Sequence, residues 1–137
     1  MIAPRRYRFL SLVILLGLLS SSCKDTVAGS VSNIDKITFP DSKISYKRTI
    51  QPLFNIGCAI NGCHDLATKS SNLDLSDYVG IKQRFYDVVI VRDTVKSRLI
   101  WYIDGRLTSS QWHRPLNVNQ IKGFKKWIME GATDTIP

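Results

Sequence analysis

The chain has 137 residues, 44% hydrophobic and 22% charged, which suits one compact globular domain and excludes a disordered or fibrous protein. Lys and Arg number 19 against 11 Asp and Glu, so the formal net charge is +8. The three cysteines are an odd number and cannot all pair in internal disulfides, so at least one needs another role. No period of about 20 to 50 residues recurs, which excludes a repeat solenoid.

The first 22 residues have the pattern of an export signal. Three arginines, at positions 5, 6 and 8, precede an apolar run (Phe9–Leu19) that is shorter than the roughly 20 residues needed to cross a bilayer. Three serines follow, and then Cys23. This ending resembles the lipobox of bacterial lipoproteins, which implies that Cys23 carries a lipid and becomes the new N-terminus. The alternative is an ordinary secretory signal that leaves Cys23 as a free thiol.

Removal of the signal changes the charge and the expected partners. Without residues 1–22 the chain loses three arginines, and its net charge falls from +8 to +5. The remaining basic residues form no long run and no stripe interleaved with aromatic residues, so nucleic acid is not an expected partner. We predict an exported lipoprotein held stably at a membrane by its N-terminal lipid, on the periplasmic face or at the outer membrane.

The mature chain is predicted to have a tether and one folded domain. Residues 23–44 are polar with no sustained apolar period and are predicted to be a flexible tether, which leaves 45–137 as the domain. Apolar spacing predicts an amphipathic helix from Ser45 to Gly57 that starts or kinks at Pro52, and a second helix over 79–91. Between them lies a loop with a short extended piece at 73–75. A third, short helix follows an N-cap at Ser97.

The last predicted helix has the clearest signals. Asn117 and Gln120 have the spacing of a capping box, and the apolar residues behind them repeat at helical spacing until Gly131 ends the pattern. The prediction is therefore an all-α domain of three to four short helices with long loops. About 90 residues of such a domain have a thin core, and small domains of this kind usually need a staple, a metal or a cofactor.

The residues that indicate a cofactor are Cys58, Cys63 and His64. Two cysteines followed directly by a histidine are typical of c-type haem attachment, in which the thiols bond to the vinyl groups and the imidazole binds the iron. The usual spacing has two residues between the cysteines and this chain has four, which a turn at Asn61-Gly62 can absorb. Two alternatives remain at this point: a Cys58–Cys63 disulfide, or a zinc site that includes His113.

Three flanking segments share a pattern with a known family. They read IQPLF at 50–54, NLDLSDY at 72–78 and WIMEGA at 127–132. In this order, around the cysteine motif, they resemble the single-haem cytochrome c-like domain of exported proteins from Planctomycetes- and Bacteroidetes-type bacteria. The resemblance covers residues 46–132. It implies a small all-α fold wrapped round one haem c, with Cys58 and Cys63 bound covalently and His64 as the proximal iron ligand.

The chain departs from this family at the sixth iron ligand. The family usually supplies a methionine just before a proline, whereas the corresponding loop here reads Gln111-Trp112-His113-Arg114-Pro115. We hypothesise that His113 is the distal ligand; the alternative is a distal position left open. Trp112 is predicted to form part of the haem wall, and Arg114, with Arg106, to pair with the haem propionates.

The predicted function is electron transfer and not catalysis. No acid–base pair, activated nucleophile or glycine-rich phosphate loop accompanies the cysteine motif, and a carrier needs only a held cofactor and a docking face for redox partner proteins. One alternative is a haem protein with an open distal site that acts as a ligand sensor or peroxidase-like enzyme. Another is a non-haem binding lipoprotein stapled by a Cys58–Cys63 disulfide.

Overall fold

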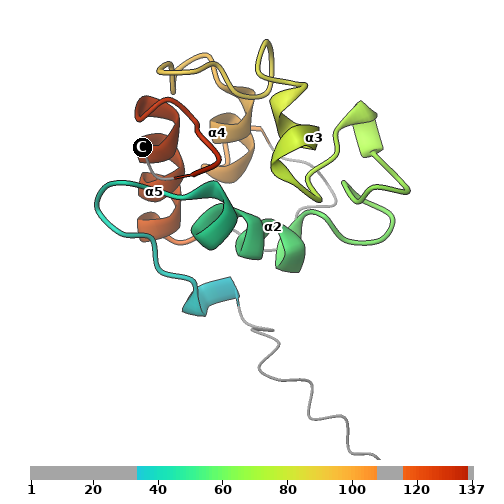
Figure 1. Ribbon diagram of the computed structural model, residues 1–137, viewed down its shortest axis with the longest axis horizontal. Coiled ribbons are helices and arrows are strands. Elements are labelled where there is room, and N and C mark those ends of the chain that lie inside the picture. The colour runs from blue at the N-terminus through green and yellow to red at the C-terminus, as the bar shows by residue number, and fades with distance from the viewer. Residues whose placement is uncertain (1–33, 108–115, 136–137) are drawn as a thin grey trace, which may run out of the picture. The chain divides into compact units, whose positions relative to one another are not determined.

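The computed structural model describes residues 34–107 and 116–135. Within these ranges the chain is helical and contains no β-strand, and its one β-type pairing is an isolated antiparallel bridge between Ile90 and Asp93. The α-helices are α2 (Gln51–Gly57), α3 (Tyr78–Lys82), α4 (Arg98–Ile103) and α5 (Val118–Met129), and the shorter helical turns are η1 (Ile34–Lys36), η2 (Tyr46–Ile50) and η3 (Ser70–Asn72) (Figure 1). The predicted all-α class is confirmed. In the described part of the chain, no helix has the length and apolar character to cross a membrane.

The helix predicted from Ser45 to Gly57 is present, with a change of winding inside it. The Ser45 hydroxyl accepts a hydrogen bond from the Arg48 amide (3.2 Å), as an N-cap does. The first turn, η2, is a wide π-turn in which the Ile50 amide reaches the Ser45 carbonyl at 3.4 Å. Pro52 then lies in the first turn of α2, where a missing N–H leaves no hydrogen bond unmade.

The predicted capping box of the last helix is confirmed. Asn117 accepts from the Gln120 amide at 3.0 Å, and the Gln120 side chain accepts from the Asn117 amide at 3.1 Å. Helix α5 ends at Met129, and Gly131 follows with φ +107°, donating its amide to Ile128. A positive φ at this position is the reason the sequence has glycine there.

The helix predicted over 79–91 is wrong in extent. Only Tyr78–Lys82 is helical, and the chain continues in turns. Val88 and Val89 are nevertheless buried, and the Val88 carbonyl accepts from the Leu99 amide at 2.9 Å. These residues are apolar because the turns pack them into the core, which a pattern of spacing cannot distinguish from a helix face.

Helix α4 begins after Ser97, as predicted, but the Ser97 side chain does not cap it. Its buried hydroxyl makes no cap; it accepts from the Ile90 amide (2.8 Å) and donates to the Asp93 carbonyl (2.6 Å). Ser97 therefore closes the turn that precedes α4, and the helix begins where that turn ends.

The predicted boundary between tether and domain at residue 45 is corrected to Ile34 or earlier. Ile34, Phe39 and Ile44 are each no more than 2% exposed, and the Gln120 side chain on α5 donates to the Ile34 carbonyl at 2.7 Å. The Phe39 ring lies so close to Gly123 that a Cβ there would overlap it. A polar segment is held here by three apolar side chains and by hydrogen bonds from α5, so its composition did not reveal the packing.

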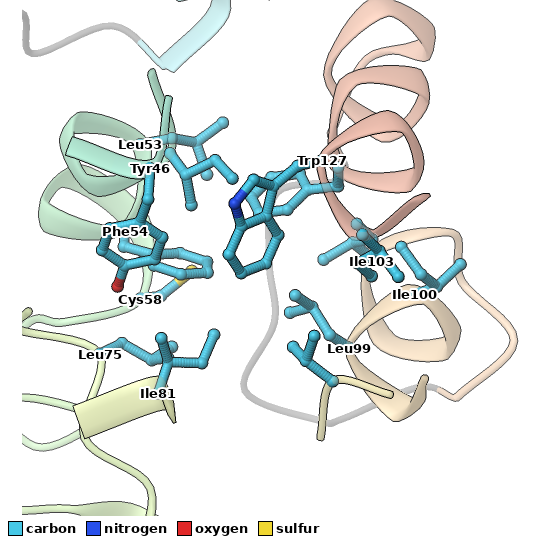
Figure 2. Packing of buried hydrophobic residues seen from close by; sticks show 14 of the residues in the cluster. Tyr46, Leu53, Phe54, Cys58, Leu75, Ile81, Leu99, Ile100, Ile103 and Trp127 are labelled. Carbon is cyan, nitrogen blue, oxygen red and sulfur yellow. The ribbon is translucent and has the colours of Figure 1, made fainter. Parts of the chain in front are cut away.

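An aromatic core, defined here as Phe39, Tyr46, Phe54, Phe124 and Trp127, joins α2 to α5. The ring centroids of Tyr46 and Trp127 are 5.6 Å apart, and those of Phe54 and Phe124 are 5.5 Å apart. Figure 2 shows Trp127 with the labelled side chains of α2 on one side and those of α4 on the other. Cys58, the residue directly after α2, belongs to the same buried cluster, so the rigid core positions the first cysteine of the motif.

Candidate functional site

One cavity brings together the three motif residues. It has a volume of about 310 Å³ and is lined by Cys58, Cys63 and His64. Its apolar walls come from α2, from the extended segment 73–75, from α4 and from Leu116. This size lies at the lower end of the range of ligand pockets, about 300–1,000 Å³, and an apolar lining with a few convergent polar groups is typical of them. The cavity is therefore the candidate site.

The loop between the cysteines is a closed turn. The His64 amide donates to the Cys58 carbonyl at 3.1 Å, so the chain returns on itself within the motif. Gly62 has φ +82°, and its amide donates to the Thr68 hydroxyl at 3.1 Å. The predicted turn at Asn61-Gly62 is thus present, and it accommodates the two extra residues between the cysteines. Glycine supplies the left-handed backbone that the turn requires.

Both cysteines of the motif are free thiols. Cys58 is buried, and this burial, together with the nearby Cys63, raises the pKa of its thiol to about 12. In residues 34–107 and 116–135, no three His, Cys, Asp or Glu side chains converge on a point where a metal ion could bind. The zinc site considered from the sequence includes His113, which lies outside the described residues, so it stays an alternative.

The orientation of His64 is defined by the extended segment 73–75. The ring Nδ1 lies 3.2 Å from the Leu73 carbonyl, and the Leu75 amide donates to the His64 carbonyl at 2.8 Å. Because a carbonyl only accepts, Nδ1 is the donor in this contact, and in the neutral imidazole the lone pair is then on Nε2. Metal-binding histidines have this arrangement, with one nitrogen bonded to a carbonyl and the other free to ligate. Gln51 of α2 secures the segment by donating to the Leu75 carbonyl (2.9 Å).

Arg84 and Arg98 also line the cavity, and the sequence did not indicate a role for either of them. Arg84 forms a paired contact with Asp87, with Nε 3.0 Å from Oδ1, and Arg98 Nη1 lies 4.0 Å from the same carboxylate. The hydrogen bonds from Arg84 hold the pKa of Asp87 below its usual range. No motif marks either arginine, because both lie far along the chain from the cysteines and only folding brings them to the cavity.

Arg106 is not at the cavity, in contrast to its predicted role. Its Nε lies 3.0 Å from Asp104 Oδ1, and its guanidinium is 5.7 Å from the centre of the Trp101 ring. Trp101 donates its indole N–H to the Val95 carbonyl at 2.6 Å and does not line the cavity. Trp127 is a fully buried core residue.

Four predicted site residues lie outside the described part of the chain: Cys23, Trp112, His113 and Arg114. Leu116, the first described residue after the segment that holds three of them, lines the cavity. The lipid attachment at Cys23, the distal ligand at His113, the wall at Trp112 and the propionate partner at Arg114 stay predictions.

A second hollow, of about 410 Å³, lies beside α5. Its lining includes Lys122, Lys125, Lys126 and Met129, and contains neither cysteine nor histidine. Two of these lysines already lie near carboxylates: Lys125 Nζ is 3.8 Å from Asp104, and Lys126 Nζ is 3.8 Å from Glu130. Although it is larger, this hollow has neither the thiols nor the imidazole of the motif, so the chemistry points to the cavity of the cysteines.

No protein-family model, curated protein or solved structure matches this chain. The functional argument therefore depends on the cavity itself. Cys58, Cys63 and His64 all line this largely apolar cavity, which also has arginines in its wall. Such a site can hold a large apolar group that offers bonding carbon atoms, a metal to ligate and acidic substituents.

Proposed function

We propose that this protein is an exported, lipid-anchored cytochrome that binds one haem c in the cavity of Cys58, Cys63 and His64 and carries single electrons between redox partner proteins. The observation that carries the proposal is the orientation of His64. Its Nδ1 lies 3.2 Å from the Leu73 carbonyl, which leaves Nε2 as the nitrogen available to a metal, and His64 lines the same cavity as both cysteines. A c-type haem requires these three groups together.

The other residues of the cavity suit the same group. Cys58 and Cys63 hold it through thioether bonds, and the neutral thiol of Cys58 is the protonated form that adds across a vinyl group. The apolar walls exclude water from the ring, and the arginines at 84 and 98 offset the charge of its carboxylates. A bound haem supplies an iron that gains and loses one electron. Holding and orienting that iron is the task of this chain's residues.

The site of action follows from the N-terminal pattern. Covalent haem attachment and a lipobox-like Cys23 are compatible, because both belong to exported proteins. The stretch between Cys23 and Ile34 joins the lipid to a domain that begins earlier than its polar composition indicated. The partners are proteins able to donate or accept one electron at a membrane surface.

The first experiment measures covalent haem. The full chain is produced in a host with c-type haem assembly and tested by the pyridine haemochrome assay and by intact mass. We expect one haem in the wild type and none in the Cys58→Ala/Cys63→Ala double variant. Cys23→Ala is the matched control: it should keep the haem and lose the lipid. A wild-type protein without covalent haem, or with a Cys58–Cys63 disulfide in its place, would contradict the proposal and support the non-haem binding lipoprotein.

The second experiment identifies the sixth ligand and separates a carrier from a sensor or enzyme. With His64 and His113 on opposite faces, the ferric and ferrous forms should both be low-spin, and the ferrous form should bind carbon monoxide poorly. His113→Ala should lose the low-spin spectrum and bind carbon monoxide readily. A low-spin spectrum that survives this change would exclude His113 as the ligand. Ready carbon monoxide binding by the wild type would favour an open distal site, as in a ligand sensor or peroxidase-like enzyme.

A further inference from the structure

We propose that Arg84 is a positioning residue that holds the turn at 69–72 and thereby sets the orientation of the His64 imidazole. Arg84 contacts neither His64 nor the Leu73 carbonyl; it acts through the backbone between them. The effect on a bound iron rests on the proposed function, whereas the effect on the turn does not.

The turn at 69–72 has a backbone that its side chains disfavour. Lys69, Ser71 and Asn72 have φ values of +46°, +56° and +56°. They are three of the six described residues other than glycine with positive φ, and they fall within four consecutive positions. Residues with a Cβ adopt this region only when surrounding structure holds them there, and such clusters occur at functional sites. Contacts from outside the turn must therefore stabilise it.

Arg84 provides those contacts. Its Nη1 donates to the Ser71 carbonyl and to the Asn72 carbonyl, each at 2.9 Å. The rest of the guanidinium faces Asp87, with Nε 3.0 Å from Oδ1 and Nη2 on Oδ2. A guanidinium is a rigid plane of hydrogen-bond donors. The ion pair with Asp87 fixes the orientation of this plane, and the plane in turn fixes the positions of the Ser71 and Asn72 carbonyls. Only 16% of the Arg84 side chain and 24% of the Asp87 side chain are exposed.

The next carbonyl along the chain is the one that His64 uses. Leu73 follows Asn72 directly, and its oxygen lies 3.2 Å from His64 Nδ1. If the turn relaxed toward an ordinary backbone, the Leu73 carbonyl would rotate and the imidazole would lose the partner that defines its tautomer. Removing the hydrogen-bond partner of a metal-binding histidine typically weakens metal binding or activity by about 10–100-fold.

Other contacts to this segment do not fix the same two carbonyls. Lys69 Nζ lies 3.6 Å from Asp74, but nearly half of the Lys69 side chain is exposed. The Ser70 amide donates to the Cys63 carbonyl at 2.9 Å, which holds the start of the turn. Arg98 shares Asp87 and lines the same cavity, yet no hydrogen bond joins it to residues 69–72 in the described structure. Arg98 is therefore the matched control.

The test compares Arg84→Ala, Arg84→Lys and Arg98→Ala in the full, haem-loaded chain. The first readout is hydrogen exchange at the Leu73 and Leu75 amides, which are bonded to Ser70 and His64. We expect exchange at least tenfold faster in both Arg84 variants, since lysine keeps the charge but cannot reproduce the planar fork. Exchange in Arg98→Ala should match the wild type.

The second readout is the reduction potential. Loss of the positioning contact and loss of the positive charge should change this potential in opposite directions. An imidazole that loses its Nδ1 partner is a weaker donor to ferric iron, so the potential should rise in Arg84→Lys, which loses the contact and keeps the charge. In Arg84→Ala the two effects oppose each other. A tenfold loss of preference for ferric iron corresponds to about 59 mV. Removal of a positive charge alone favours ferric iron, so Arg98→Ala should lower the potential or leave it unchanged.

The two readouts also separate failure of this inference from failure of the proposed function. Wild-type exchange or an unchanged potential in Arg84→Lys would show that Arg84 acts only as a charge and would overturn the inference. If Arg84→Ala does not fold, Arg84→Lys decides the question. A wild-type chain without covalent haem would overturn the proposed function, and hydrogen exchange on the haem-free chain would still test the effect of Arg84 on the turn.

Discussion

The aromatic core and the cavity around His64 are built in different ways. In the aromatic core, rings from α2, α5 and the 34–44 segment fill the space completely, and Tyr46, Phe54, Phe124 and Trp127 are each no more than 1% exposed. Around the cavity the chain runs mostly in turns, and polar contacts fix its backbone. The contrast shows that the described side chains pack one region into a core, whereas in the other region the described residues line a cavity.

The difference has a physical cause. Apolar burial stabilises a region in proportion to the surface removed from water, and the aromatic core achieves this without help. The cavity leaves apolar surface uncovered and includes a strained turn, so its own contacts stabilise it less. A bound cofactor would cover that surface. The two regions should therefore respond differently to mutation.

The largest effect is expected at the centre of the aromatic core. Trp127→Ala removes a fully buried indole that packs on Tyr46 and donates to the Thr133 carbonyl. We expect a loss of about 3–5 kcal/mol in the free energy of unfolding, measured by urea denaturation. Val118→Ala, on the exposed side of the same helix, should change it by no more than about 0.5 kcal/mol. A loss below about 1 kcal/mol for Trp127→Ala would show that the aromatic core is not the main source of stability.

The next effect tests whether the 34–44 segment is part of the domain. Gly123→Ala places a methyl group into the Phe39 ring, so we expect about 1–3 kcal/mol of destabilisation from overpacking. In a Phe39→Ala background the clash with the ring is removed and only the contact with the Cβ of residue 39 stays, so the same change should cost less. Equal costs in both backgrounds, measured as a double-mutant cycle, would mean that Phe39 does not pack on α5.

Gly62, in the loop between the two cysteines, should respond more weakly than Gly123, and for another reason. No atom lies within 4 Å of a Cβ built on Gly62, so Gly62→Ala has space and suffers only from its φ of +82°. We expect Gly62→Ala to lower the free energy of unfolding, measured by urea denaturation, by about 1–2 kcal/mol. Gly62→Asn should cost less, because asparagine tolerates the left-handed region better. If the asparagine variant is as unstable as the alanine variant, backbone strain is not the cause.

The smallest effect is the pH dependence of the Arg84–Asp87 pair. The pKa of Asp87 is lowered in the folded protein, chiefly by the hydrogen bonds from Arg84, so the unfolded chain binds its proton at higher pH. The pair should contribute its stability at neutral pH and lose it as the pH falls below about 4. Its size should be about 1 kcal/mol or less, because both side chains keep some contact with water. Asp87→Asn should remove this share of the pH dependence; an unchanged profile would contradict the assignment.

Elements governed by contacts between near neighbours were predictable. The capping box at Asn117 and Gln120 and the end of α5 at Gly131 depend on residues a few positions apart, and both are present. The turn at Gly62 follows the same rule. Such signals are readable because the bond and both partners lie within one stretch of sequence.

Elements governed by distant contacts were not predictable. The apolar residues at 88–89 indicated a helix but are buried from turns, and the polar 34–44 segment indicated a tether but packs on α5. Arg84 and Arg98 were not identified because no local pattern distinguishes them from surface charges. In each case the side chain has its role only through a partner far away in the chain.

The sequence by itself determined which groups are available: two thiols and a histidine in one motif, and helices with defined ends. Tertiary structure alone decided how they are presented. The Leu73 carbonyl assigns the His64 proton to Nδ1, and Arg84 holds the backbone that carries Leu73. A ligand's identity is a property of one residue, but its tautomer and direction depend on partners that only the folded chain brings within hydrogen-bond distance.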